Sequence, residues 1–335
     1  MRYGNDNPAS QSPILRGWQL SLVLLFVSIA ILGLMILVGA DFNYAQLLAL
    51  LHRLGFALVF SLLLLSCLNF TLRTLRWHWF TRRLRLDVSI SDSAVYYLAG
   101  FSMGVTPGRM GEFIRLWMLR RYNGISYHRA LPLLIADRVN DLLVVVVLSL
   151  CAGLMIDTSS LVYVVPALLL MIVANTLLRH PRYLLATIDT LYAVTRRWRR
   201  LFAAARRMLR SGREMFSATN AAFASAFSIV AWFAECLAFY LLLSALDTGM
   251  SLELATFIYT FATLVGALSF LPGGLGGFEA TAVILLSARG VDLGTAVFAT
   301  SVIRLTTLWF SVALGSFLLT YVLFYKGANN GQTRS

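Results

Sequence analysis

The chain has 335 residues, of which 59% are hydrophobic and 13% are charged. Soluble globular proteins carry about 25% charged residues, so this composition excludes a soluble globular domain and predicts a chain covered largely by lipid. The net charge of +13 does not indicate nucleic-acid binding, because the basic residues lie between apolar stretches rather than on one face. They are all arginine except Lys326, and positive charge in short loops marks the cytoplasmic side of a membrane protein.

Six apolar stretches are long enough to cross a bilayer, since a helical crossing needs about 20 apolar residues. They cover residues 18–40, 54–75, 130–155, 161–178, 221–246 and 293–325. Arg2 and Arg16 place the N-terminus in the cytoplasm. The loop after the second stretch is also predicted to be cytoplasmic, from a basic cluster of Arg73, Arg76, Arg82, Arg83 and Arg85. An even number of crossings then keeps both termini in the cytoplasm.

Two further apolar stretches, residues 93–119 and 252–287, are interrupted by proline and glycine, which break helices. The first break reads Thr-Pro-Gly-Arg-Met-Gly-Glu over residues 106–112. The second reads Leu-Pro-Gly-Gly-Leu-Gly-Gly-Phe-Glu over residues 271–279. Each arm is too short to cross, which predicts two re-entrant hairpins. The flanking charges predict that the first hairpin enters from the cytoplasm and the second from outside.

The segment 181–215 differs from the rest, because apolar residues recur in it at helical spacing among many arginines. This pattern is typical of an amphipathic helix that lies on the inner leaflet. A solvated helix–loop connector is the alternative.

The two breaks resemble each other and predict an internal repeat. Pro107-Gly108-x-Met110-Gly111-x-Phe113 aligns with Pro272-Gly273-x-Leu275-Gly276-x-Phe278, and Arg138 and Arg304 follow at similar distances. Each unit contains two crossings, a hairpin and a third crossing. Because three crossings is an odd number, the second unit is inverted in the membrane. The predicted fold class is therefore an all-α polytopic membrane protein with two inverted-topology repeats, six full transmembrane helices and two re-entrant helical hairpins.

The predicted organisation follows from these elements. It comprises a cytoplasmic tail at 1–17, membrane repeat 1 at 18–156, membrane repeat 2 at 160–325 and a cytoplasmic tail at 326–335.

Ionisable residues at membrane depth are the candidate functional residues, because each costs about 2.5–3.5 kcal/mol when unpaired at the centre of a lone helix. Two interpretations stay open. In the first, they form structural ion pairs, such as Glu112 with Arg115 and Asp141 with Arg138. In the second, they line a polar cavity for a charged substrate, and the acids either limit its positive charge or relay protons.

The glycines favour the second interpretation. Helices are predicted to resume at Gly111 and Gly276, so two positive helix N-termini would point toward the midplane from opposite sides. With Arg109, Arg138 and Arg304 as further donors, this predicts an anion site that favours phosphate. The predicted substrate-binding residues are Pro107, Gly108, Arg109, Gly111, Glu112, Arg115, Asp137, Arg138, Asp141, Glu235, Pro272, Gly273, Gly274, Gly276, Gly277, Glu279 and Arg304. The cysteines and histidines show no metal-ligand or nucleophile pattern, so no metal, cofactor or catalytic residue is predicted.

These motifs together resemble the transmembrane flippase domain of lysylphosphatidylglycerol synthases. The resemblance covers about residues 15–325 and rests on the two glycine breaks and on the Asp137-Arg138 pair. It implies a protein of the bacterial inner membrane with inverted repeats that moves lipids, or helps to move them, between leaflets. The full synthases carry a soluble aminoacyl-transferase domain after the membrane region. Only about ten residues follow the last crossing here, so we do not expect lysyl-lipid synthesis.

The expected function is therefore a lipid flippase rather than an enzyme. It would move an anionic phospholipid or a polyprenyl-phosphate-type lipid through a polar cavity at the repeat interface, with a lateral opening beside Arg109 and Arg304. One alternative is a membrane-embedded glycosyl- or phosphotransferase that acts on a lipid carrier, although the loops lack an Asp-x-Asp run. A small-molecule secondary transporter is the other. Membrane lipids are the expected partners, nucleic acid is not, and a homo-oligomer is left open.

Overall fold

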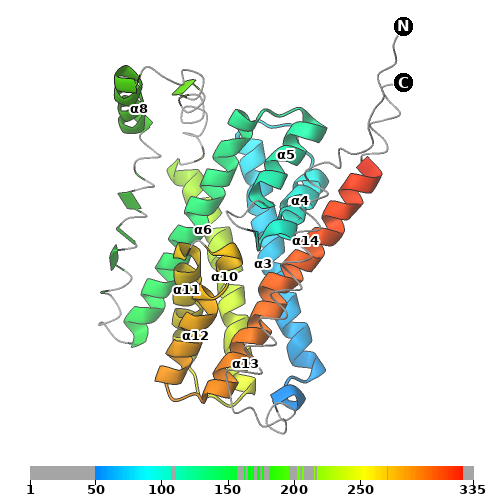
Figure 1. Ribbon diagram of the computed structural model, residues 1–335, viewed down its shortest axis with the longest axis vertical. Helices are drawn as coiled ribbons and strands as arrows, with labels where there is room; N and C mark the ends of the chain where they lie inside the picture. Colours follow the sequence, from blue (N-terminus) through cyan, green and yellow to red (C-terminus); the bar gives the residue numbers. More distant parts are fainter. Residues whose placement is uncertain are drawn as a thin grey trace.

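All regular elements among the described residues of the computed structural model are helices (Figure 1). The structure describes residues 50–106, 111–156, 181–195, 217–269 and 271–326, together with isolated helical positions between 162 and 215. The predicted crossing at 18–40, most of the one at 161–178 and the tail at 1–17 lie outside the described residues.

Among the described residues, four helices are long and apolar enough to cross a membrane, and they match four of the six predicted crossings. The first three are α3 (Phe56–Arg83), α6 (Tyr127–Ile156) and α10 (Ala218–Ala245). The fourth is a continuous stretch made of α13 (Leu293–Arg304), the π-helical turn η6 (Leu305–Trp309) and α14 (Phe310–Tyr321), followed by η7 (Val322–Lys326).

Both interrupted stretches form a helix, a break and a second helix, as predicted. The first comprises α4 (Ile90–Ala99), the short 3-10 turn η1 (Gly100–Met103) and α5 (Gly111–Asn123). The second comprises α11 (Leu252–Leu268), the turn η5 (Pro272–Gly274) and α12 (Gly277–Ala288). We call them the first and second broken pairs.

The second break depends on glycine for its backbone geometry. Gly273 has φ 63° and Gly276 has φ 83°, values in the left-handed region that other residues rarely adopt. Pro272 is the first residue of the turn η5, and it has no backbone N–H to donate to a hydrogen bond. The chain therefore leaves α11, reverses within a few residues and enters α12.

The second crossing, predicted at residues 54–75, extends further along the chain than predicted. Helix α3 continues to Arg83, so Arg73 and Arg76 belong to the helix and are buried rather than part of a basic loop. The buried positions of α3 recur every three or four residues as far as Thr81, the spacing of one helix face. Arginine is tolerated on that face because it meets carboxylates there.

The amphipathic segment is helical over the part that the structure describes as continuous, α8 (Pro181–Thr195). In Figure 1 this helix lies apart from the main bundle. Its position relative to a lipid surface stays a prediction.

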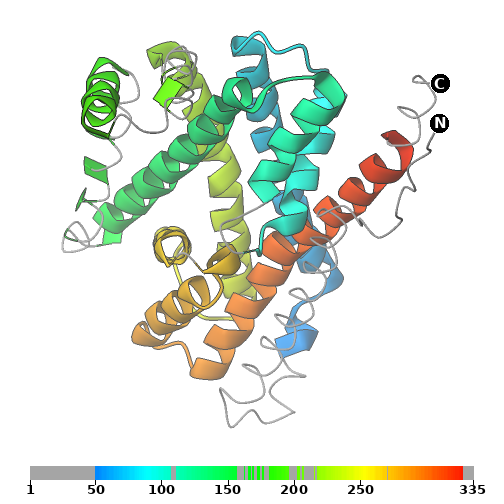
Figure 2. The same ribbon diagram turned by 45° about the horizontal axis from the view of Figure 1, so that its top comes forward.

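Helices from the first and second halves of the sequence pack against one another. Helix α3 packs against α10. The closing helix α6 packs against α11 of the second broken pair, while α14 packs against α4 and η1 of the first. In both views the broken pairs lie toward opposite ends of the bundle (Figures 1 and 2).

Each broken pair is embedded in its own apolar cluster. One cluster surrounds the first pair and includes Trp77, Tyr97 and Leu119, and the other surrounds the second pair and includes Phe239 and Phe278. Each broken pair is thus held by packed apolar side chains.

Replacing Gly315 of α14 by alanine is expected to push this helix away from η1. An added Cβ would lie 2.5 Å from the Ser102 backbone nitrogen and 2.7 Å from the Leu98 carbonyl oxygen. Backbone atoms cannot turn aside as a side chain can, so we expect a loss of about 1–3 kcal/mol in unfolding free energy. Unfolding of the purified protein in detergent measures it. Gly55→Ala is the matched control, since nothing lies within 4 Å of its added Cβ. Equal stability of the two variants would contradict this packing.

Candidate functional site

A cavity of about 500 Å³ lies between the two broken pairs and the helices that follow them. Its walls come from α3, α6, α10 and α13 as well as from both pairs. Nine predicted site residues line it: Gly111, Glu112, Arg115, Arg138, Asp141, Glu235, Gly273, Gly274 and Arg304. Residues as far apart in the sequence as Gly111 and Arg304 therefore meet at one site.

The remaining predicted site residues fall into two groups. Asp137, Pro272, Gly276, Gly277 and Glu279 do not line the cavity, although Asp137 and Glu279 contact arginines that do. Pro107, Gly108 and Arg109 lie outside the described residues.

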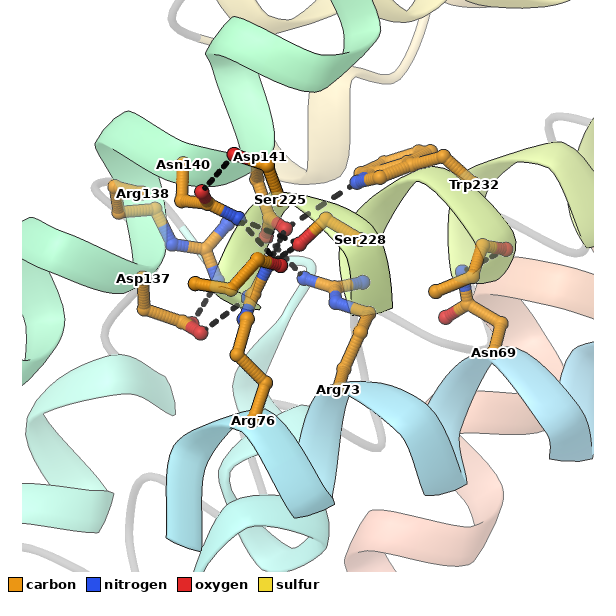
Figure 3. A network of polar contacts seen from close by, with 12 residues as sticks. Asn69, Arg73, Arg76, Asp137, Arg138, Asn140, Asp141, Ser225, Ser228 and Trp232 are labelled. Atoms are coloured by element: carbon orange, nitrogen blue, oxygen red, sulfur yellow. Dashed lines mark hydrogen bonds and ion pairs between the residues drawn. The ribbon is translucent and has the colours of Figure 1, made fainter. Parts of the chain in front are cut away.

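The first half of the site is a buried network that joins α3, α6 and α10 (Figure 3). Arg76 bridges two carboxylates of α6, donating to Asp137 and, at 2.6 Å, to Asp141. Arg73 donates to the other oxygen of Asp141 at 2.7 Å. From α10, Trp232 Nε1 donates to Asp141 at 3.2 Å. Three arginine–carboxylate contacts thus fix the relative positions of α3 and α6.

Neutral polar groups complete this network. Asn140 Nδ2 donates to Ser228 Oγ at 2.6 Å, and Ser225 Oγ donates to Asn140 Oδ1 at 3.0 Å. Arg76 also contacts Ser228. Buried polar groups without partners are destabilising in hydrocarbon. These hydrogen bonds give the polar side chains between α6 and α10 the partners that they need at membrane depth.

Two similar ion pairs tie each broken pair to the helix that follows it. Glu112, the second residue of α5, lies 3.0 Å from Arg138 of α6. Glu279, the third residue of α12, lies 2.6 Å from Arg304 at the end of α13. Each pair thus combines a glutamate in the first turn after a break with the arginine that the repeat alignment had matched.

The pairing expected along single helices was wrong. Glu112 contacts Arg138 instead of Arg115, and Arg115 contacts Asp137. Asp141 contacts the arginines of α3 instead of Arg138. Neighbours on one helix share a face but hold parallel side chains, whereas a facing helix can present its guanidinium directly to the carboxylate.

The two helix N-termini differ from the prediction in one respect. The Gly276 backbone N–H, expected to be free, donates to Glu279 Oε2 at 2.7 Å. Arg304 Nη2 donates to the Gly273 carbonyl oxygen at 2.8 Å. The start of α12 is therefore capped by the chain itself. Gly111 at the start of α5 faces the cavity, so the positive end of this helix is directed toward it.

Arg115 is the least neutralised arginine of the cavity wall. It is 1% exposed, and its contact with Asp137 is long, 3.4 Å between Nη1 and Oδ2. Its Nε has no hydrogen-bond partner. The guanidinium carbon lies 3.8 Å from the centre of the Tyr97 ring, a cation–π contact that holds it without neutralising its charge.

Several residues of the candidate site were not predicted as site residues. Arg73, Trp232 and Tyr259 line the cavity, and Arg76 contacts Asp141 of its wall. The missed signal for the two arginines is the helical spacing of residues 62–81, which continues through them. Nothing local distinguishes Trp232 or Tyr259 from other aromatic residues of apolar helices.

In the part of the chain that the structure describes, His, Cys, Asp and Glu side chains form no group of three or more that could hold a metal ion. The charged residues of the site instead partner one another.

Comparison with known proteins agrees with this architecture. A family model described as the lysylphosphatidylglycerol synthase TM region matches residues 19–315. The chain belongs to this family. It is therefore a multi-pass integral membrane protein, and the match runs through both broken pairs and the whole cavity.

Two archaeal proteins described as membrane proteins are similar to this chain. A UPF0104 membrane protein of Methanothermobacter thermautotrophicus is 26% identical over 286 residues, which cover 78% of this chain and 85% of the relative. A UPF0104 membrane protein of Pyrococcus horikoshii is 24% identical over 300 residues, covering 81% and 88% of the two chains.

Proposed function

We propose that this protein is a lipid translocase, which moves lipids with an anionic headgroup between the two leaflets of the cytoplasmic membrane. The headgroup passes through the central cavity while the acyl chains stay in the surrounding bilayer. Membrane lipids are thus its partners, of the anionic phospholipid or polyprenyl-phosphate type.

The observation that carries this proposal is the arginine lining of the cavity. Arg73, Arg115, Arg138 and Arg304 come from four helices and converge on one space at membrane depth. Arginine binds phosphate oxygens through its fork of N–H donors, and each such charge-assisted bond is stronger than a neutral one. A headgroup that enters the cavity exchanges its hydration for these donors, which lowers the cost of crossing hydrocarbon.

The size and rim of the cavity support a headgroup as the occupant. Pockets of about 300–1,000 Å³ hold drug-sized molecules, so a cavity of about 500 Å³ accommodates a polar headgroup and leaves long acyl chains outside. Leu271 lines the cavity and is 49% exposed, and Leu305, next to Arg304, is 43% exposed. These apolar residues support a lateral opening toward lipid near Arg304.

The layout proposed for the membrane follows the same features. The two broken pairs enter from opposite faces as re-entrant hairpins of an inverted repeat, and their positions at opposite ends of the bundle support this (Figure 2). The irregular backbone of the second break faces the cavity, where Arg304 donates to the Gly273 carbonyl oxygen. Both termini lie in the cytoplasm.

Reconstituted protein in liposomes tests the function. Fluorescent phosphatidylglycerol, phosphatidylcholine and a polyprenyl phosphate are placed in the inner leaflet, and their appearance outside is followed by quenching from the medium. We expect the two anionic lipids to move faster than in protein-free liposomes and faster than phosphatidylcholine. No movement of any lipid by protein shown to be folded would overturn the proposal.

The same preparation separates the alternatives. Turnover of a lipid-linked sugar by the purified protein would favour a membrane-embedded transferase. Uptake of a water-soluble phosphate ester without any lipid movement would favour a small-molecule transporter.

A further inference from the structure

Glu235 of α10 differs from the other buried carboxyl groups of the site. Each of the others contacts at least one arginine: Glu112, Asp137, Asp141 and Glu279. Glu235 is 5% exposed and lines the cavity, and its hydrogen bond comes from the neutral Tyr259 hydroxyl at 2.8 Å. Among the described residues, no basic side-chain nitrogen lies within ion-pair distance of it.

The charged neighbours of Glu235 are engaged elsewhere. Arg73 of α3 donates to Asp141, and Arg304 of α13 donates to Glu279 and to the Gly273 carbonyl. Asp141 of α6 repels a negative charge at this position. The titratable groups that face Glu235 from the packed helices are thus Arg73, Asp141, Tyr259 and Arg304, with Cys236 beside it on α10.

Protonating Glu235 breaks no ion pair among the described residues, whereas protonating any of the other four carboxylates would leave an arginine without its partner. A proton on Glu235 also changes the charge of the whole site. Five arginines, namely Arg73, Arg76, Arg115, Arg138 and Arg304, then face four carboxylates among the described residues. The described charges of the site thus sum to one net positive charge when Glu235 is protonated and to none when it is ionised.

We propose that Glu235 carries a proton that accompanies the anionic headgroup, so that binding of one phosphodiester anion is coupled to uptake of one proton. The carboxylate takes the proton from a hydronium ion of the solvent that reaches the open cavity, which leaves a water molecule. The neutral acid then donates its O–H to a headgroup oxygen, while Tyr259 still donates to the other carboxyl oxygen. When the headgroup leaves, the O–H bond breaks and the proton returns to water. This inference rests on the proposed function.

The test measures binding and proton uptake separately from transport. Calorimetric titration of the detergent-solubilised protein with dihexanoyl phosphatidylglycerol, in buffers of different ionisation enthalpy, counts the protons taken up per lipid bound. We expect up to one proton per lipid. The affinity should fall by up to tenfold per pH unit above the pH at which free Glu235 ionises, as linkage requires.

Three variants locate the effect. Glu235→Gln is expected to take up no proton and to lose the pH dependence of binding, while Glu235→Asp restores both in part. Glu253→Gln is the matched control, since this glutamate lies in the first turn of α11 and does not line the cavity. It should bind and take up protons like the unmodified protein.

The outcomes separate the two proposals. Binding of the lipid without proton uptake, or proton uptake that survives in Glu235→Gln, overturns the role of Glu235 and leaves the translocase proposal standing. Failure of the folded protein to bind the anionic lipid at any pH counts against both.

Discussion

Replacing Arg76 by methionine is expected to lower the unfolding free energy by about 3–5 kcal/mol. Arg76 is fully buried and joins Asp137 and Asp141 of α6 to α3. Without it, Asp137 keeps only long contacts with arginine, 3.4 Å to Arg115 and 3.6 Å to Arg138. An uncompensated carboxylate then remains in a low-dielectric interior, which is the costly outcome of breaking a buried ion pair. The midpoint of unfolding in mixed detergent and denaturant measures the loss.

Matched variants show whether the loss comes from the buried charge. Arg53→Met removes an exposed arginine whose partner Asp247 is also exposed, and surface pairs contribute about 0–1 kcal/mol. Arg76→Lys keeps the charge but cannot reach both carboxylates with one planar fork, so an intermediate loss is expected. If Arg76→Met proves no less stable than Arg53→Met, the network does not hold α3 against α6.

Replacing Arg138 by glutamine is expected to weaken binding of anionic lipid by roughly 10- to 100-fold, with a far smaller loss of stability than Arg76→Met. Arg138 lines the cavity and its side chain is 26% exposed, so a headgroup can reach it. A hydrogen bond to a charged group contributes about 1.5–3 kcal/mol, and about 1.4 kcal/mol corresponds to tenfold in affinity. Its partner Glu112 is 18% exposed and can turn to water when the arginine is lost. Calorimetric binding of dihexanoyl phosphatidylglycerol measures the change.

The controls for Arg138 separate charge from geometry. Arg138→Lys should retain part of the affinity, because it keeps a positive charge without the bidentate fork. Arg53→Gln removes one positive charge far from the cavity and should bind normally. Unchanged lipid affinity in Arg138→Gln would remove this arginine from the headgroup site.

Local sequence properties determined much of this protein. Apolar length predicted α3, α6, α10 and the long helix from Leu293, because the crossing length is a property of each stretch alone. Proline and glycine predicted both breaks, because they act on the backbone where they stand. The alignment of the two breaks also placed Arg138 and Arg304 at equivalent positions, and the structure pairs each with a glutamate just after a break.

Only the tertiary structure decided which charged side chains pair. It also decided that Glu235 has no arginine partner among the described residues. Arg76 finds its carboxylates 61 and 65 residues away, on a helix that no local pattern places beside α3. The same arginines resemble loop charges in the sequence, because positive residues at a helix end usually mark the cytoplasmic side. Glu235 looks like any other membrane-depth acid until the neighbouring helices show that the arginines are already engaged. The packing of the helices decides which side chains lie opposite each other at the cavity. It therefore decides which arginine pairs with which carboxylate.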